Sequence, residues 1–247
     1  MTGGATGIGA ALKEQLRERG HTVVVVDIKG ADVVADLSTE AGRSDAVNGI
    51  TELAPDGLDG FIPCAGLGNH ITPHSLIGAV NYFGVIATVE GLRDLVAKKR
   101  GTVLLVSSNS APMMPADNPY VEACLAGDEA AALALLEDGN TAYMGSKRAL
   151  TQWMRRNVDA YAKAGVRLNA VAPGITRTPL SEGAAQDPAL ADAMRDFEAI
   201  TPVGGSASPE QIADAMRFLL SEDASFVCGA MLFVDGGTDA LLRPDSF

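Results

Sequence analysis

Short apolar runs alternate with amphipathic segments along this chain, and that alternation constrains the fold more than any other feature. The runs, rich in Val, Ile, Leu and Ala, lie at His21–Asp27, Ala31–Ala35, Leu58–Ala65, Thr102–Ser108, Val166–Ala172 and Ala230–Val234. Strands that alternate with helices form a parallel sheet whose two faces are covered by helices. We therefore predict an α/β fold with a doubly wound parallel sheet.

The predicted helices carry start and stop signals. Apolar residues recur every four positions from Ile8 to Leu16, and Gly20 follows as a C-terminal stop for a helix over 8–19. Ser208 is a suitable N-cap, and the proline after it suits the first position of a last helix that runs to about residue 220. No segment of the 247 residues has the composition of a linker, so we predict a single domain over 1–247.

Composition excludes several classes of partner. The formal net charge of −12 and the lack of a basic patch argue against nucleic acid. No run approaches the ~18 consecutive apolar residues of a membrane span. The three cysteines are odd in number and widely spaced, and the three histidines add no ligand pattern, so we expect neither disulfides nor a metal site. The start lacks the pattern of a secretory signal, and we expect a cytoplasmic protein.

A glycine-rich turn opens the first predicted helix, with the sequence Thr2-Gly-Gly-Ala-Thr-Gly-Ile-Gly9. Such a turn lets backbone N–H groups approach a pyrophosphate, although glycines also serve ordinary turns. Asp27 closes an apolar run about 20 residues later, where a carboxylate accepts hydrogen bonds from an adenosine ribose. Alone, Asp27 is equally well a solvated acid at a strand end. Together the two features predict NAD rather than NADP, a preference that the nearby Lys29 is able to soften.

The first strand of such a fold is missing from the sequence. A glycine turn of this kind follows a central strand, but Met1 stands where that strand is expected to end. Either the start as written is truncated or the protein manages without the strand. We expect truncation, because the loss of a central strand exposes two ladder edges.

Four polar residues follow in the order Asn81, Ser108, Tyr143 and Lys147. Tyr143 and Lys147 are four residues apart in a helical segment and project from one face. An ammonium beside a phenol lowers the phenol pKa, so Tyr143 is predicted to exchange a proton with a substrate oxygen. Taken singly, each of the four has an ordinary structural explanation, as a strand end, a cap or a surface pair.

The glycine turn and the four polar residues in this order resemble the short-chain dehydrogenase/reductase family, and the segments Ala172–Gly174 and Val234–Gly237 add to the match. The similarity covers essentially the whole chain and implies a Rossmann fold. Within the family, the chain is most similar to hydroxysteroid dehydrogenases and carbonyl reductases. That similarity is carried by Ala35–Thr39, Cys64–Gly68, Val80–Gly84 and Arg243–Phe247.

The resemblance implies a role for each residue. Tyr143 is the general acid for ketone reduction and the base for alcohol oxidation. Lys147 holds the nicotinamide ribose and lowers the tyrosine pKa. Ser108 stabilises charge on the substrate oxygen, and Asn81 helps to hold a water of a proton relay. The implied cofactor contacts are Gly3, Thr6, Gly7, Ile8, Gly9, Asp27, Ile28, Asp36, Leu37, Ala65, Gly66, Tyr143, Lys147, Thr176 and Thr178.

Two features depart from the family pattern. Pro63-Cys64-Ala65-Gly66 stands where Asn-Asn-Ala-Gly is usual, and Ser108 and Tyr143 are unusually far apart. We predict a helical insertion over about 115–140, with helices at Tyr120–Leu125 and Glu129–Glu137. It is either a surface hairpin or, as the resemblance implies, a contact in a homo-oligomer, which is a dimer or a tetramer. The apolar side chains that suit such a contact are Ala130, Ala131, Leu133, Leu135 and Leu136.

By analogy with the family, residues 179–207 form a lid over the substrate. Flexible or apolar side chains there and just past Ser108 suit an apolar ligand, although they also suit a core; these are Met113, Met114, Met194, Phe197 and Ile200. We expect an NAD-dependent oxidoreductase that interconverts a secondary alcohol and a ketone, with a 3α-hydroxysteroid or a similar apolar carbonyl compound as substrate.

Two alternatives remain open: the same chemistry on a non-steroid ring ketone or diol, and a non-catalytic NAD-binding sensor. Enoyl reduction is disfavoured, because that branch of the family spaces its tyrosine and lysine more widely. The short chain and the glycine spacing disfavour sugar-nucleotide epimerases.

Overall fold

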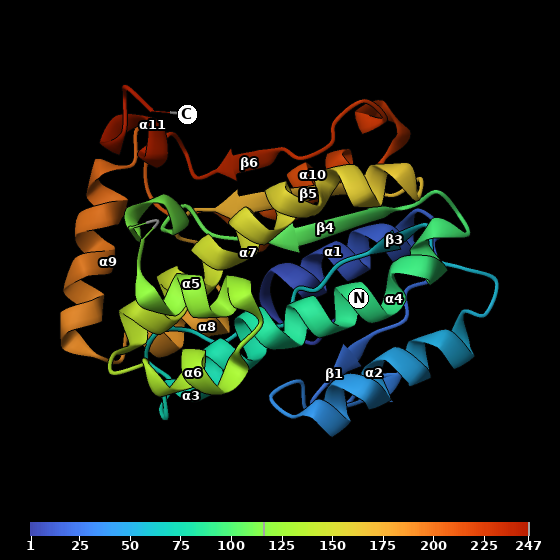
Figure 1. Cartoon of the computed structure of the whole chain (residues 1–247). Helices are drawn as coiled ribbons and strands as arrows, with labels where there is room; N and C mark the ends of the chain where they lie inside the picture. Colours follow the sequence, from blue (N-terminus) through green and yellow to red (C-terminus); the bar gives the residue numbers. More distant parts are fainter. Residues whose placement is uncertain (116, 247) are drawn as a thin grey trace.

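A computed structural model describes residues 1–115 and 117–246 of the chain. Position 116 of the predicted insertion and position 247 of the C-terminal similarity therefore lie outside the described residues. Within the described part, parallel strands form a central layer between two layers of helices (Figure 1). This arrangement confirms the predicted doubly wound α/β fold.

Six strands lie at the predicted places, most of them shorter than the apolar runs. They are β1 Val26–Asp27, β2 Val33–Val34, β3 Gly60–Phe61, β4 Thr102–Val106, β5 Arg167–Pro173 and β6 Met231–Val234. One sheet pairs β1 with β2, and a second has the order β3-β4-β5-β6; every pair is parallel. The long central pair β4 and β5 is buried throughout almost its whole length, which is typical of a parallel sheet covered by helices on both faces.

Thr2 joins the two sheets, at the place where the central strand is expected. It forms parallel bridges with Val26 on one side and Pro63 on the other. The Thr2 N–H donates to the Ile62 carbonyl at 3.0 Å, and the Val26 N–H donates to the Met1 carbonyl at 2.9 Å. The residues Met1 and Thr2 thus fill the position of the central strand next to the glycine turn. The full sheet order is β2, β1, the Met1–Thr2 segment, β3, β4, β5 and β6.

The helices cover both faces of this sheet (Figure 1). Their bounds are α1 Gly7–Glu18, α2 Glu40–Leu53, α3 Ser75–Gly78, the π-helix η1 Ala79–Gly84, α4 Val85–Ala97, the 3-10 helix η2 Ala111–Met113, α5 Pro119–Ala126, α6 Glu129–Ala134, α7 Gly139–Lys163, α8 Pro179–Ala184, α9 Pro188–Ile200, α10 Pro209–Leu220, the 3-10 helix η3 Glu222–Ala224 and α11 Thr238–Leu242. The predicted last helix is α10, and Ser208 caps it through a hydrogen bond from the Gln211 N–H at 3.4 Å. The short helix α11 was not predicted.

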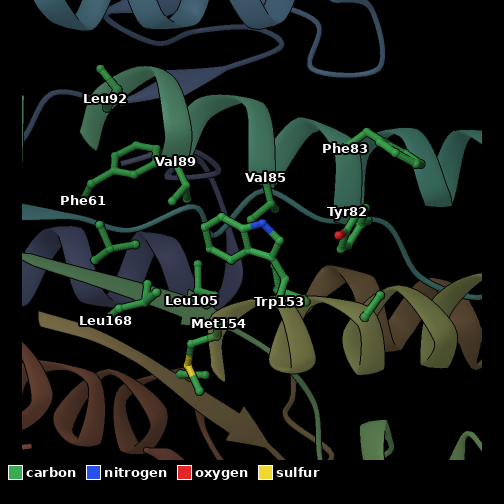
Figure 2. Packing of buried hydrophobic residues seen from close by; sticks show 14 of the residues in the cluster. Phe61, Tyr82, Phe83, Val85, Val89, Leu92, Leu105, Trp153, Met154 and Leu168 are labelled. Carbon is green, nitrogen blue, oxygen red and sulfur yellow. The ribbon is translucent and has the colours of Figure 1, made fainter. Parts of the chain in front are cut away.

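Two apolar clusters hold these layers together. Helices α2, α4 and α7 pack on one face of the sheet, and α1 and α10 pack on the other. Figure 2 shows the larger cluster, in which Trp153 of α7 points toward Val85 of α4 above the strand residue Leu105. Burying each such large side chain contributes about 1.5–3 kcal/mol, so these clusters hold the strand ends in place.

The insertion folds as two helices, α5 and α6, that pack against α7 and α3. The Tyr120 hydroxyl is within hydrogen-bonding distance of Ser146 Oγ on α7, at 2.8 Å. Leu133 and Leu136 pack on the core, whereas Leu135 is 45% exposed. The five apolar residues of the insertion therefore do not share one exposed face, because Leu133 of α6 and Leu136 beyond it turn inward over Gly78.

The segment Ser75–Ala97, which contains α3, η1 and α4, is long and apolar enough to cross a membrane. In this structure 61% of its most apolar window is buried inside the protein. Such burial is typical of a core helix, and Figure 2 shows its residues Val85 and Val89 pointing toward the strand residues of the cluster.

Candidate active site

A cavity of about 660 Å³ lies at the carboxyl ends of the parallel strands. It is lined by the residues that directly follow β3, β4 and β5, which is where ligands bind in open α/β sheets. Every predicted cofactor and catalytic residue except Asn81 lines it. These are Gly3, Thr6, Gly7, Ile8, Gly9, Asp27, Ile28, Asp36, Leu37, Ala65, Gly66, Ser108, Tyr143, Lys147, Thr176 and Thr178.

The glycine turn packs tightly on itself and on the segments that carry Ala65 and Thr178. Gly3 has φ +69°, and a Cβ there would collide with the backbone of Ala65. A Cβ at Gly9 would collide with the Gly3 carbonyl, and one at Gly7 would lie 3.2 Å from Thr178 Cγ2. These close approaches leave backbone at the N-terminus of α1 facing the cavity, which suits a phosphate group.

Two carboxylates lie at one end of the cavity. Asp27 accepts hydrogen bonds from the backbone N–H of Ala5 at 3.1 Å and of Ile28 at 2.8 Å. Asp36 accepts from the hydroxyl and the N–H of Ser38, and these bonds lower the Asp36 pKa below its usual value. Asp27 thus ties the end of β1 to the glycine turn, in a place suited to the hydroxyls of a ribose.

Ser108 and Tyr143 lie together at the other end. Ser108 Oγ is 2.9 Å from Ser110 Oγ and accepts from the Ser110 N–H at 3.2 Å. Burial raises the Tyr143 pKa above its usual value, and a hydrogen bond with Ser108 partly opposes this. The Tyr143 pKa is therefore raised in this structure, opposite to the predicted lowering by Lys147, because burial disfavours the charged phenolate.

Lys147 lies one helical turn beyond Tyr143, as the spacing predicts. Its Nζ is 5.7 Å from the centroid of the Tyr143 ring and donates to the Val106 carbonyl at 2.7 Å. The side chain is almost fully buried, and burial lowers the Lys147 pKa to about 8. Of the three ammonium donors, Val106 takes one, so the others can face a ligand in the cavity.

Asn81 lies behind the cavity wall, not in it. It is fully buried in η1, and its amide clamps Leu67: Oδ1 accepts from the Leu67 N–H at 2.7 Å and Nδ2 donates to the Leu67 carbonyl at 2.9 Å. A Cβ at Gly66 would lie 3.3 Å from Asn81 Oδ1 and 4.0 Å from Lys147 Nζ. The Asn81 side chain therefore positions the Gly66–Leu67 loop beside the lysine, and its role in a proton relay stays a prediction.

Thr176 and Thr178 lie between the end of β5 and the predicted lid. Thr176 Oγ1 donates to the Gly174 carbonyl at 2.9 Å. Thr178 begins α8 with a capping box, in which its side chain accepts from the Ser181 N–H at 3.3 Å. Both threonines line the cavity next to the glycine turn.

The substrate end of the cavity is mostly apolar. Of the five apolar residues named from the sequence, Met113, Met194 and Phe197 line it. Met114 is buried in the core, and Ile200 is 41% exposed and lies outside the lining. Met114 therefore has the core role that the sequence also allowed, whereas Ile200, the last residue of α9, does not make the expected ligand contact.

Several residues that line the cavity were not predicted from the sequence, namely Asn69, Ser110, Asn140, Met144, Leu180 and Leu190. Asn140 stands three residues before Tyr143, so helical spacing offered a signal for it. Asn69 offered none, because a loop brings it to α7, where its Nδ2 donates to Asn140 Oδ1 at 2.7 Å.

Comparisons with known proteins agree with this site. The sequence profile of the family described as Enoyl-(Acyl carrier protein) reductase matches residues 3–239. The chain is 41% identical to a 3-alpha-hydroxysteroid dehydrogenase/carbonyl reductase of Comamonas testosteroni, covering 100% of this chain and 98% of the relative. It is 32% identical to a cis-4-hydroxycyclohexanecarboxylate dehydrogenase of Sinomonas cyclohexanicum, covering 98% and 96%.

The fold is also similar to solved structures. The 3-alpha-hydroxysteroid dehydrogenase from Pseudomonas sp. B-0831, complexed with NADH, superposes with a TM-score of 0.96 at 45% identity and covers 100% of this chain and 98% of that one. The profile match, the full-length relatives and the site agree on one family. The chain belongs to the short-chain dehydrogenase/reductase family.

Proposed function

We propose that this protein is an NAD-dependent oxidoreductase that interconverts a secondary alcohol and a ketone, with a 3α-hydroxysteroid or a similar apolar carbonyl compound as substrate. One observation carries the proposal: Ser108, Tyr143 and Lys147 line one end of the same cavity whose other end is formed by the glycine turn and Asp27. A dinucleotide spans such a cavity, and its reactive ring then lies beside the tyrosine.

The residues of the cavity fit NAD. Gly3, Gly7 and Gly9 line the cavity at the N-terminus of α1 with bare backbone, which a pyrophosphate needs. The Asp27 carboxylate suits two ribose hydroxyls and repels a 2′-phosphate, which favours NAD over NADP. NAD, when bound, supplies the acceptor or donor of the hydride. The NADH complex of the Pseudomonas enzyme supports the same assignment.

The polar residues at the substrate end then transfer the proton to or from the substrate oxygen. In the direction of ketone reduction, Tyr143 donates its phenolic proton to the substrate oxygen. Ser108 donates a hydrogen bond to the same oxygen, while the Ser110 N–H holds the serine in place. The Lys147 ammonium stabilises the phenolate that forms and binds the ribose beside it. In alcohol oxidation the proton moves the opposite way.

The apolar lining of the substrate end supports an apolar ring compound, with Met113, Met194 and Phe197 as its contacts. The similarity to a hydroxysteroid dehydrogenase favours a steroid. The similarity to the cis-4-hydroxycyclohexanecarboxylate dehydrogenase supports a second candidate, a smaller ring alcohol. Although the matching profile is named after enoyl reductases, the four-residue spacing of Tyr143 and Lys147 argues against that reaction.

A non-catalytic NAD-binding sensor is the alternative from another class. Such a protein has no need for Ser108 and Tyr143 placed side by side with a buried lysine. We also expect a homo-oligomer, a dimer or a tetramer, in the cytoplasm. Light scattering coupled to size exclusion measures the oligomeric state directly.

The test follows NADH formation by absorbance, with NAD and a 3α-hydroxysteroid such as androsterone, and with NADP in a parallel cuvette. We expect turnover with NAD that largely vanishes with NADP. Turnover of cyclohexanol-type alcohols but not of the steroid would select the second candidate. Binding of NADH, seen by fluorescence, without turnover of any alcohol would support the sensor instead.

A further inference from the structure

Arg43 is a buried cation that the proposed reaction does not use. It lies on α2 with 8% of its surface exposed. Its guanidinium forms a bidentate ion pair with Glu129, in which Nη1 lies 2.7 Å from Oε2 and Nη2 lies 2.6 Å from Oε1. A buried planar guanidinium holds its hydrogen-bond partners in one geometry, because each N–H donor has a defined direction.

The same guanidinium binds the backbone of two segments that form the cavity. Nε donates to the Leu37 carbonyl at 2.9 Å, and Nη2 donates to the Ala79 carbonyl at 3.0 Å. Leu37 and its neighbour Asp36 line the end of the cavity where Asp27 lies. Ala79 is the first residue of η1, the π-helix that carries Asn81.

Glu129 supplies the counter-charge from the insertion. It is the first residue of α6, and its side chain is 35% exposed. The insertion is itself anchored on the catalytic helix, because Tyr120 packs where a Cβ at Gly145 would lie 2.6 Å from its ring. The ion pair therefore links α7, through the insertion, to the loop that follows β2.

We propose that Arg43 is a positioning residue for the adenosine end of the cofactor, and that the insertion supplies Glu129 to hold it. The inference rests on the proposed NAD function, since it concerns the cofactor half farthest from Tyr143. With Glu129 in place, the Arg43 guanidinium holds the Leu37 carbonyl. It thereby keeps Asp36 and Leu37, which line the cavity, in the position that binds the cofactor. The insertion affects cofactor affinity through the ion pair between Glu129 and Arg43. This effect does not depend on whether the insertion also takes part in an oligomer contact.

Removing the ion pair has different effects on ligand binding if the pair only stabilises the fold than if it positions the cofactor site. Loss of a structural pair lowers the stability of the whole fold and weakens every ligand alike. Loss of a positioning pair weakens ligands that have an adenosine half and spares those that lack one. Reduced nicotinamide mononucleotide lacks the adenosine half, so comparing it with NADH separates the two.

The experiment compares the wild type with Glu129→Gln and Arg43→Lys. Asp159→Asn is the matched control, because Asp159 forms a 2.6 Å ion pair with Lys163 on the outer part of α7, where both side chains are 75% exposed. For each protein, fluorescence titration gives the dissociation constant of NADH. Steady-state kinetics gives kcat/KM with reduced nicotinamide mononucleotide and a ketone. Hydrogen exchange of the segment 36–39 is measured without cofactor.

We expect Glu129→Gln and Arg43→Lys to weaken NADH binding on the order of tenfold, with mononucleotide turnover within about twofold of the wild type. Exchange over 36–39 rises in both variants, and Asp159→Asn matches the wild type. Unchanged NADH affinity, or an equal loss with both nucleotides, would overturn the proposal. If the wild type itself bound no NADH, the proposed function would fail, and exchange over 36–39 would still show whether Glu129 holds that segment.

Discussion

The Lys147 ammonium lies over the ring of Tyr143, 5.7 Å from the ring centroid, and burial acts on the pKa of both residues. It raises the pKa of the phenol and lowers that of the ammonium, so burial favours the neutral form of each. At neutral pH the pair is a protonated phenol beside an ammonium. This is the state that ketone reduction requires, because the tyrosine then has a proton to donate.

Removing the phenolic hydroxyl tests the acid. We expect Tyr143→Phe to lower kcat for ketone reduction by about 10²–10⁴, the usual contribution of a general acid. NADH binding should change little, because the hydroxyl faces Ser108 rather than the glycine turn. Fluorescence titration and steady-state kinetics on the same preparation check both statements. A variant that kept wild-type kcat would show that another group supplies the proton.

The lowered pKa of Lys147 predicts how stability changes with pH. Its pKa is about 8 in the fold and 10.5 as its ordinary value, so between these the unfolded state binds more protons. Stability contributed by this group therefore rises with pH through that window, by about 3 kcal/mol in total. Lys147→Met has no such titration.

Urea unfolding of the wild type and of Lys147→Met is measured at about pH 7.5, 8.5 and 9.5, up to the middle of this pH window. The comparison isolates what the Lys147 titration contributes to the free energy of unfolding. The free energy of unfolding of the wild type should gain on that of the variant as pH rises. The shared titration of other groups cancels in the difference. A difference that stays constant over this range would mean that Lys147 is not desolvated in the fold.

Asp27 is expected to decide between the two nicotinamide cofactors. Asp27→Ala removes a charged acceptor for ribose hydroxyls, which costs about 1.5–3 kcal/mol, or tenfold and more in kcat/KM with NADH. Turnover with NADPH should rise, because the repulsion of its 2′-phosphate is gone. Asp159→Ala is the control, since Asp159 lies on the exposed side of α7 outside the cavity lining. Equal losses with both cofactors would contradict the assignment.

Gly3 and Gly30 offer a matched pair for the phosphate cradle. Both have positive φ, +69° and +62°, but a Cβ at Gly3 collides with Ala65 whereas one at Gly30 meets nothing within 4 Å. Gly30→Ala should cost about 1–2 kcal/mol of backbone strain and keep NADH binding. Gly3→Ala should lower the melting temperature further and abolish NADH binding. Retained binding in Gly3→Ala would place the pyrophosphate elsewhere.

Phe197 is expected to contribute to steroid affinity through α9. Phe197→Ala removes an aromatic face from the substrate end of the cavity and should raise KM for androsterone about tenfold, with KM for NAD unchanged. Phe226→Ala is the control, because Phe226 is fully exposed outside the cavity. An unchanged KM in Phe197→Ala would show that α9 does not cover the bound substrate.

Much of the site could be predicted from spacing along the chain. The residues Tyr143 and Lys147 share a helical face, Ser108 follows an apolar strand and Asp27 ends one, so their places depend on local periodicity. The Tyr143 pKa could not be predicted in this way. Its direction depends on how far the fold removes the phenol from water, which a neighbouring charge in the sequence does not reveal.

The sequence by itself determined the alternation of strands and helices, the phosphate turn and the order of the polar residues. Short local patterns along the chain are enough to recognise each of these features. Only the tertiary structure decided that the Asn81 amide binds the Leu67 backbone and that Arg43 forms an ion pair with Glu129. These partners are 14 and 86 residues apart along the chain. Contacts at such separation depend on how packed layers meet, and no local pattern encodes that.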